Sequence, residues 1–581
     1  MSNYHNHNRK SNYLNGKHTA LWILLFGFLL QIGFFIAYQL IGDVHVDEAM
    51  LLLNARSLAD NGTDILGEKT PIYFDTWLYG GQSPLATYLA ALFIKIFGYK
   101  LWISRLPILI CSMAGLVAVK GFTRELFPKN GFLQNIILLV SAIEPWRLFQ
   151  GAWTLDCAYF PYMMLFGMYF LAKAVNGKQQ ILNLILSMVF FALGFYAYIA
   201  SALLIPIFLL LIFILLLAKK KIKFSRAVIS AVALAVVSLP FILFGLVQTG
   251  IIDSVSLVSL TIEKMQYYAR GDTSTVFGKM GDASAFFAQV WTNISGALFA
   301  FIMPDNIAFN VFADASNSGI ISAYSYSHIV GGALATVGFG IFCWITNGRR
   351  KRVKCSNAGV TDSSLCFIRA LIITFFIYSV LVLYSQNAGY RYAAFYPLFH
   401  IFEGLCIYQI FSLSGENIRK AVKTLIPVCV VLSIALTSFT LARFSQSSNP
   451  LYMKSFSEVM KIAEENDCDK ITFVDCENQF YRERESVFIR FYEYDNLDEI
   501  QPLETELLKR GALSSGKKTE TRLINIKNDG SWCYDAITSA SDMTEDCYIF
   551  CDKSDVLDDV DKNVYEVRNT GLYTICVKNN H

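Results

Sequence analysis

The chain has 581 residues, of which 54% are hydrophobic and only 16% are charged, and its mean hydropathy is +0.42. Soluble domains carry about 25% charged residues, so this composition excludes a series of ordinary soluble domains. The net charge of +3 gives no reason to expect nucleic-acid binding, and the positions of the basic residues are more informative than their sum.

Apolar runs of spanning length recur through the first three quarters of the chain. A transmembrane helix needs about 20 mostly apolar residues. Eleven runs meet this requirement: 20–41, 103–123, 131–147, 157–175, 181–197, 199–218, 227–249, 328–346, 364–385, 391–411 and 421–443. The first run is longer than a signal-peptide core and has no small-residue cleavage site after it, so we expect a retained span and a cytoplasmic tail over 1–19. The pattern predicts a polytopic α-helical membrane protein with about 11 transmembrane helices.

Two further apolar stretches, 84–98 and 286–303, are ambiguous, and the basic loops help to place them. Cytoplasmic loops carry an excess of Lys and Arg. With eleven spans and a cytoplasmic N-terminus, all four basic loops fall on the cytoplasmic side. These loops lie at 124–129, 219–226, 349–354 and 419–423. Counting either stretch as a span would move two or three of them outside, so we expect both to be interfacial or re-entrant segments.

The same parity places three parts of the chain outside: a first loop of 42–102, a large loop of 250–327, and the tail. We therefore expect a transmembrane domain over 20–445 and an extracytoplasmic domain over 446–581. The tail is rich in charged residues and has short alternating runs, which predict a small α/β domain. Six cysteines in the tail permit up to three disulfides, and reduced structural thiols explain them equally well. They are Cys468, Cys476, Cys533, Cys547, Cys551 and Cys576.

Four titratable side chains follow the first predicted span within six residues: Asp43, His45, Asp47 and Glu48. Such a cluster at a membrane boundary is costly unless it is used or well solvated. The residues from Glu48 onward have the pattern of a helix, so Asp47 and Glu48 begin it, where the backbone dipole favours negative charge. A purely structural acidic cap is the alternative to a functional role.

Further motifs follow in a fixed order, and none of them is specific alone. They are Asn54-Ala55-Arg56-Ser57-Leu58, Gly81-Gln82-Ser83-Pro84-Leu85, Phe97-Gly98 and Arg105-Leu106-Pro107. Together with the acidic pair after the first span, this ordered set resembles the GT-C glycosyltransferases. It is most similar to the branch of protein O-mannosyltransferases and aminoarabinose transferases, over about residues 20–410 and most strongly over 41–127.

The resemblance implies a bacterial cell-membrane enzyme that moves a sugar from a polyprenyl-phosphate donor to an acceptor at the outer face, with inversion. It implies that Asp47 is the general base for the acceptor hydroxyl and that Glu48 orients the acceptor or caps the helix. The acceptor is left open among a protein, a glycolipid and a cell-wall polymer. No cofactor and no metal is expected, although His45 with its two flanking aspartates has the residue types of a metal site.

The second predicted outside loop supplies a second carboxylate. An acid eleven residues after the proline of a Pro-Trp pair matches the family pattern and corresponds to Asp156. Two departures put donor contacts in this loop in doubt. Arg147 stands where the family usually has His, and Ala152 stands where it has Arg.

The leaving group implied by the resemblance is a lipid phosphate, which requires cations to stabilise its charge. The candidates outside the membrane are Arg391, Lys264 and Arg270, and snorkelling at the interface is the alternative for Arg391. Further candidate substrate contacts are His45, Gln82, Tyr324, His328 and Tyr392. An aromatic belt explains the residues near 324–328 as well as substrate contact does.

Two other functions compete with a transferase. A multi-spanning transporter or flippase of lipid-linked or cell-envelope substrates would have paired repeats and ionisable residues inside spans. We find no convincing repeat, and the charges cluster at span ends and in outside loops. A catalytically inactive scaffold that presents the tail domain is the third alternative, and Asp47 and Asp156 argue against it.

Overall fold

The computed structural model describes most of the chain. The described residues are 17–75, 81–177, 179–257, 260–265, 281–302, 318–347, 359–382, 389–413, 415–444, 452–474, 479–495, 524–535, 537–551, 554–570 and 572–579. The chain divides into two compact units. The second unit combines Asp43–Asn54 with the tail from Gln446, and the first contains nearly all the remainder.

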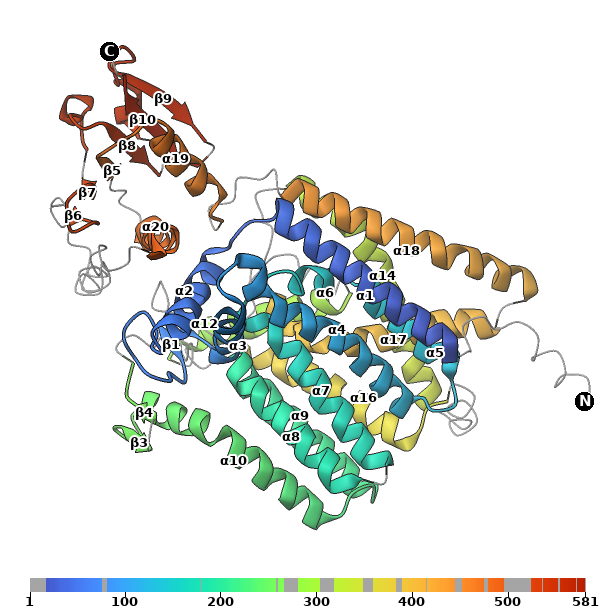
Figure 1. The fold of residues 1–581 in the computed structure, drawn as a ribbon. Coiled ribbons are helices and arrows are strands. Elements are labelled where there is room, and N and C mark those ends of the chain that lie inside the picture. The colour runs from blue at the N-terminus through green and yellow to red at the C-terminus, as the bar shows by residue number, and fades with distance from the viewer. Residues whose placement is uncertain are drawn as a thin grey trace, which may run out of the picture. The chain divides into compact units, whose positions relative to one another are not determined.

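The first unit is a bundle of long apolar helices (Figure 1). Within the described residues, eight helices are long and apolar enough to cross a membrane. The helices of this unit are α1 (Lys17–Ile41), α3 (Pro84–Phe97), α4 (Leu101–Leu126), α5 (Gly131–Ile143), α6 (Pro145–Gln150), α7 (Asp156–Asn176), α8 (Gln180–Ala197), α9 (Ser201–Ala218), α10 (Phe224–Gln248), α12 (Ala283–Ile302), α14 (Ser318–Thr346), α16 (Asp362–Leu381), α17 (Tyr396–Leu413) and α18 (Glu416–Phe444), with the 3-10 helix η4 (Gly389–Phe395) before α17.

Ten of the eleven predicted runs each coincide mainly with one helix, and the polytopic helical prediction is confirmed. The run predicted at 131–147 is not continuous. It divides into α5 and α6 at Glu144, because the residue before Pro145 is driven out of the helical region and Glu144 is extended. The stretch predicted at 286–303 forms the continuous helix α12 of 20 residues, which packs beside α14 and α16.

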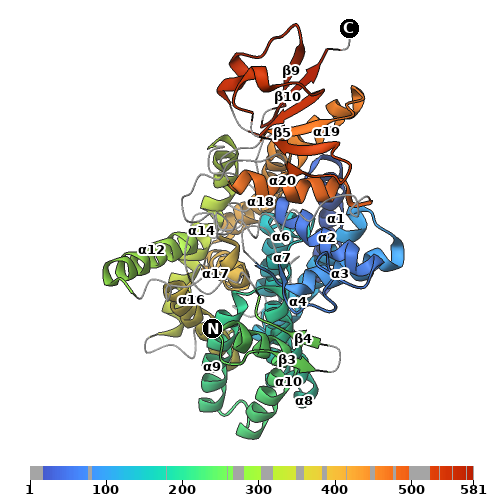
Figure 2. The same cartoon turned by 90° about the vertical axis from the view of Figure 1, so that its left-hand side faces the viewer.

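Helix contacts connect the bundle in a few close pairs. Helix α7 packs between α4 and α8, α8 also packs on α10, α9 packs on α16, and α17 packs on α5 and α14. In the pair α14 and α17, a Cβ added to Gly338 would lie 1.8 Å from the carbonyl oxygen of Phe402. Glycine is therefore required where these two backbones meet. The turned view in Figure 2 shows α14, α16 and α17 together on one side of this bundle.

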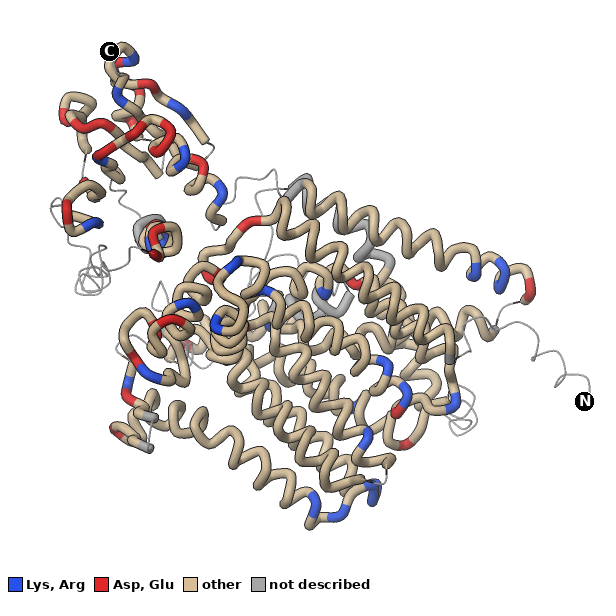
Figure 3. The backbone as a smooth tube through the Cα atoms, viewed as in Figure 1, with Lys and Arg blue, Asp and Glu red and all other residues tan. Residues whose placement is uncertain are grey.

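The helices of the bundle carry few charges along their lengths, and basic residues gather at helix ends (Figure 3). Lys and Arg at the turn between α9 and α10, at the C-terminal end of α4 and at the N-terminal end of α18 lie at the same end of the bundle. Two short hairpins belong to this unit: β1 (Phe74–Asp75) pairs with β2 (Gly81–Gln82), and β3 (Val255–Leu257) pairs with β4 (Leu260–Ile262).

The second unit contains a six-stranded mixed sheet in the order β6-β7-β5-β8-β10-β9. Its elements are α19 (Lys454–Glu465), β5 (Ile471–Val474), α20 (Gln479–Tyr492), β6 (Ile524–Asn525), β7 (Trp532–Asp535), η7 (Ala540–Asp542), β8 (Cys547–Phe550), η8 (Asp555–Asp558), β9 (Tyr565–Asn569) and β10 (Thr574–Lys578). Strand β5 is parallel to β7 and β8, and the other pairs are antiparallel. The sheet confirms an α/β tail.

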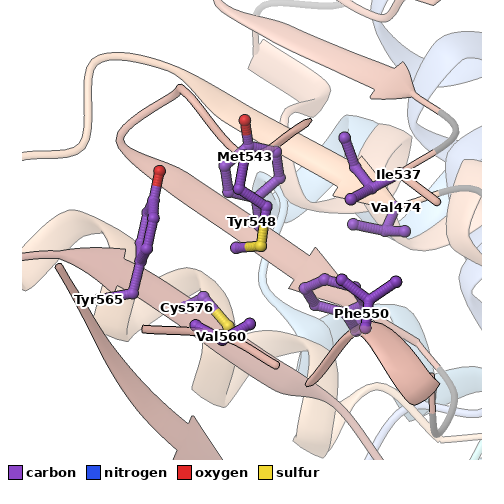
Figure 4. Packing of buried hydrophobic residues seen from close by; sticks show 9 residues of the cluster. Val474, Ile537, Met543, Tyr548, Phe550, Val560, Tyr565 and Cys576 are labelled. Atoms are coloured by element: carbon purple, nitrogen blue, oxygen red, sulfur yellow. The ribbon is translucent and has the colours of Figure 1, made fainter. Parts of the chain in front are cut away.

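One core of this unit lies around β8 and β10 (Figure 4). Tyr548, Phe550 and Cys576 pack there with Val474 and Met543, and burial of these apolar groups stabilises the sheet. Four tail cysteines are free thiols: Cys468, Cys533, Cys547 and Cys576. Cys551 is buried, and Cys476 lies outside the described ranges. Helix α2 (Val46–Asp60) begins in the second unit, of which its residues up to Asn54 are part.

Candidate functional site

Asp156 is the first residue of α7, and backbone N–H groups bind both oxygens of its carboxylate. The amide of Cys157 donates to Oδ1 at 2.7 Å, and the amide of Ser83 donates to Oδ2 at 3.2 Å. A negative charge at a helix N-terminus is favoured by the helix dipole. The bond to Ser83 links two loops that are 73 residues apart in sequence. The carboxylate is therefore held in a defined position between the first and second predicted outside loops.

The loop before Asp156 is anchored to the first two long helices. Gln39 of α1 donates through Nε2 to the carbonyl oxygen of Ala152 at 3.0 Å, and Arg105 of α4 donates to Oε1 of Gln39 at 2.9 Å. Arg105 is almost completely buried, and its guanidinium lies 5.1 Å from the ring centre of Tyr38. The Arg105 of the sequence motif thus supports the second loop through Gln39.

Arg147, the residue that departs from the family pattern, is buried within the bundle. Its Nε donates to the carbonyl oxygen of Ser141 at 2.9 Å and its Nη2 donates to that of Ala142 at 2.6 Å. Its Nη1 donates to Gln31 Oε1 at 2.9 Å and to Ser112 Oγ at 3.1 Å. These bonds occupy the guanidinium with protein partners, so Arg147 supports the loop internally.

A second buried group connects α6 to α17. His400 shares a hydrogen bond of 2.9 Å with Ser141 Oγ through Nδ1, and its Nε2 lies 3.2 Å from Glu144 Oε2. Beside this group, the ring of Trp146 stacks on Tyr396 with centroids 4.8 Å apart. The Glu-Pro-Trp segment is thereby fixed to α17 by a polar and an aromatic contact.

Arg391 lies on η4, and η4 packs against α7, the helix that Asp156 begins. The hydroxyl of Tyr378 donates to the carbonyl oxygen of Arg391 at 3.2 Å, which fixes the backbone there. The side chain of Arg391 is partly exposed, whereas Tyr392 is buried and packs edge-on against Tyr378. The structure thus brings a cation-bearing segment against the helix of the second carboxylate, and substrate contact by Tyr392 stays a prediction.

Gln82 is buried on β2, next to a glycine that the packing requires. The hydroxyl of Tyr73 donates to the carbonyl oxygen of Gly81 at 3.1 Å, and a Cβ on Gly81 would lie 1.9 Å from the Tyr73 ring. Three buried polar groups were not predicted as site residues from the sequence. The Ser83 and Thr87 hydroxyls and the Gln150 amide are buried and have no hydrogen-bond partner within the described part of the chain.

Unsatisfied buried polar groups are costly and are rare in native interiors. Ser83 is the N-cap residue of α3 and Thr87 lies in its first turn, so both hydroxyls lie at the N-terminal end of α3, where the Ser83 amide binds Asp156. These hydroxyls near the carboxylate of Asp156 are suited to a hydroxyl-rich ligand. A signal for it was present in the sequence, because polar residues within apolar segments often mark function.

The acidic cluster after α1 belongs to the second unit. Asp47 has a half-exposed side chain, with 45% of its area accessible, whereas Glu48 is completely buried. The amide of Asp47 donates to His45 Nδ1 at 3.1 Å, so this ring nitrogen is unprotonated. Burial lowers the pKa of His45 below its ordinary value of 6.5, and the charges of Asp47 and Glu48 oppose this shift only partly.

Four predicted site residues remain: Lys264, Arg270, Tyr324 and His328. Lys264 is exposed just after β4. Arg270 lies outside the described residues, and Tyr324 and His328 lie in α14, where the structure describes the helix but not their side chains. Within the described ranges there is no cluster of three or more His, Cys, Asp and Glu residues that could hold a metal ion.

Comparison with known proteins relates the residues around Ser83 and Asp156 to a family. Residues 81–244, which include Ser83 and Asp156, match the family model of dolichyl-phosphate-mannose-protein mannosyltransferase. No curated protein sequence matches the chain.

The fold is similar to that of solved membrane proteins. ArnT from Cupriavidus metallidurans bound to undecaprenyl phosphate is 11% identical, with a TM-score of 0.50, and the match covers 96% of this chain and 97% of ArnT. The archaeal oligosaccharyltransferase AglB from Archaeoglobus fulgidus is 12% identical over 80% of this chain, with a TM-score of 0.46, and the chain spans 63% of its length. Residues 81–244 thus resemble that mannosyltransferase family, and the chain shares its fold with ArnT.

Proposed function

We propose that this protein is a membrane glycosyltransferase that moves a sugar from a polyprenyl-phosphate donor to an acceptor hydroxyl at the outer face of the membrane. The observation that carries the proposal is the family match over residues 81–244, which contains the bond between Ser83 and Asp156. The fold shared with ArnT, whose solved structure holds undecaprenyl phosphate, supports a lipid-phosphate donor.

Asp47 is our candidate for the general base. Of the two adjacent acids, its carboxylate is half exposed, whereas that of Glu48 is completely buried and suits an orienting or structural role. A base must reach the proton that it removes. In the proposed step the acceptor oxygen attacks the anomeric carbon and its proton passes to Asp47. The bond from that carbon to the phosphate oxygen breaks, and the configuration inverts.

Asp156 and Arg391 are our candidates on the first unit. Asp156 is held by two amides at the start of α7, and η4, which carries the partly exposed Arg391, packs against that helix. A guanidinium there is suited to the negative charge that develops on the leaving phosphate. Lys264 and Arg270 remain secondary candidates for this role. Gln82, His45, Tyr324, His328 and Tyr392 remain predicted substrate contacts.

The proposed orientation puts the active site and the tail outside the cell. Basic residues at three helix ends gather at one end of the bundle (Figure 3), which is the cytoplasmic end by the positive-inside rule. The chain segment after α1 then begins on the opposite side. Membrane lipids surround the helices, and the proposed acceptor is a protein, a glycolipid or a cell-wall polymer.

The test is transfer of radiolabelled sugar from polyprenyl-phosphate-linked donors in proteoliposomes, comparing the wild type with Asp47→Asn. This change keeps the size of the side chain and removes its basicity, so we expect the rate to fall by about 10²-fold or more. The control is Asp60→Asn, at the other end of α2. Near-normal turnover of Asp47→Asn would reject Asp47 as the base. Absence of transfer by the wild type from every donor would reject the proposed activity.

A further inference from the structure

The segment that carries Asp47 is held by the start of the tail. His45 and Tyr452 form an antiparallel bridge, and the amide of Met453 donates to the carbonyl oxygen of Val44 at 3.0 Å. The rings of His45 and Tyr452 meet edge to face, with centroids 5.1 Å apart. Residues 43–45 and 452–454 thus form a short two-stranded contact within the second unit, which we call the base clamp.

Asp43 completes the base clamp by capping the first tail helix. Its Oδ2 accepts the amide of Lys454, the first residue of α19, at 2.7 Å, while its Oδ1 accepts the amide of Val44, also at 2.7 Å. Helix α19 has no capping bond from its own N-cap side chain, Met453. A carboxylate at a helix N-terminus binds the unpaired amides and is favoured by the dipole. Asp43 therefore does for α19 what a local cap residue ordinarily does.

The base clamp continues into the core of the tail. Phe456, in the first turn of α19, is fully buried and stacks on Phe473 of β5 with centroids 6.2 Å apart. It also packs against Tyr573, at 6.1 Å. Rigid packing of α19 on the sheet therefore fixes residues 452–454, and through them the backbone from Asp43 to His45.

We infer that the tail is a positioning element for the reaction, because the base clamp holds the backbone on which Asp47 stands. This inference rests on the proposed function, and specifically on Asp47 as the base. From His45 the restraint passes directly to Asp47, whose amide donates to His45 Nδ1. A displacement of about 1 Å in a reacting group can reduce a rate by about 10²-fold. A fixed backbone just before α2 limits such displacement.

The sharpest test removes one main-chain bond of the base clamp. Met453→Pro deletes the amide that donates to Val44, while the φ of −78° at this position already suits proline. Met453→Ala loses the same buried side chain and keeps the amide, so it is the matched control. Both variants are measured in the full-length protein for kcat and for the KM of the lipid donor.

We expect kcat of Met453→Pro to be at least about 10-fold below that of Met453→Ala, with the donor KM unchanged. In an Asp47→Asn background the same pair of changes should differ by less than about 2-fold, because a positioning residue acts through the base. Equal kcat values for the two single variants would overturn the inference. An equal loss in the Asp47→Asn background would reduce the base clamp to a structural role.

The two proposals fail in distinguishable ways. If Asp47→Asn keeps its activity, the assignment of the base fails whatever the base clamp does. If Asp47→Asn is inactive but the Pro and Ala variants are equal, only the positioning inference fails. Hydrogen exchange of the backbone from Val44 to Met50 gives a second measurement that needs no substrate. Faster exchange in Met453→Pro than in Met453→Ala is expected, and identical exchange would overturn the base clamp.

Discussion

Asp156→Asn tests whether the carboxylate at the start of α7 joins the two loops. The aspartate accepts amides on both oxygens, from Ser83 at 3.2 Å and from Cys157 at 2.7 Å. Asparagine offers one acceptor oxygen, and its NH₂ group would face an N–H. One bond to a charged acceptor is therefore lost, at about 1.5–3 kcal/mol, together with about 0.3–1 kcal/mol from the helix dipole.

The two costs sum to about 2–4 kcal/mol. At about 1.4 kcal/mol per factor of ten, the fraction of molecules in which Asp156 joins the two loops falls by about 30- to 1,000-fold relative to the fraction in which they are separate. We expect a lower unfolding temperature in detergent and a sugar-transfer rate at least about 10-fold lower. The control is Asp362→Asn, because Asp362 begins α16 as Asp156 begins α7 and is exposed. Its expected cost is only about 0.3–1 kcal/mol. If the two variants have the same stability and rate, the joining role of Asp156 is refuted.

Three further predictions concern the residues around these sites. Asp43→Ala should destabilise the tail by about 1–2 kcal/mol through loss of the cap on α19, measured by chemical unfolding, with Asp43→Asn less affected because it keeps an acceptor oxygen. Burial lowers the pKa of His45 below 6.5, so the unfolded chain binds the additional proton first as the pH falls. The wild type should therefore lose stability below about pH 6.5, and His45→Asn should lose less; parallel melting-temperature curves would contradict this. Gly81→Ala should cost about 1–3 kcal/mol because its methyl group would overlap the ring of Tyr73, whereas Gly33→Ala, with open space at Cβ, should be nearly neutral in the same thermal assay.

The sequence predicts the spans well because length and hydropathy determine them locally. The predicted run of 157–175 also begins directly after Asp156, and α7 begins at Asp156. It does not predict the break at Glu144, although Pro145 carried the signal. Nor does it predict the bond from Ser83 to Asp156, because no periodicity records a contact across 73 residues.

Polar residues within the predicted apolar spans indicate buried hydrogen-bonded groups, and the sequence interpretation did not use this signal. Gln31, Gln39 and Arg105 lie within or at the start of predicted spans, where polar groups require partners. Their partners were not predictable, because each lies on another helix or loop. Arg147 illustrates the limit. A substitution in the family pattern suggested altered donor contacts, whereas the guanidinium binds carbonyl oxygens and side chains of the bundle.

The hydrogen bond between Asp43 and Lys454 can form only late in synthesis of the chain, because its partners are 411 residues apart. At about 5–20 residues per second, the ribosome needs on the order of 20–80 s to travel from one to the other. During that interval the acidic segment has emerged and its partner has not been made. In a nascent chain stalled before residue 452, residues 43–45 would therefore lack the contacts that the tail supplies. Quality-control proteases could recognise the exposed segment during that interval.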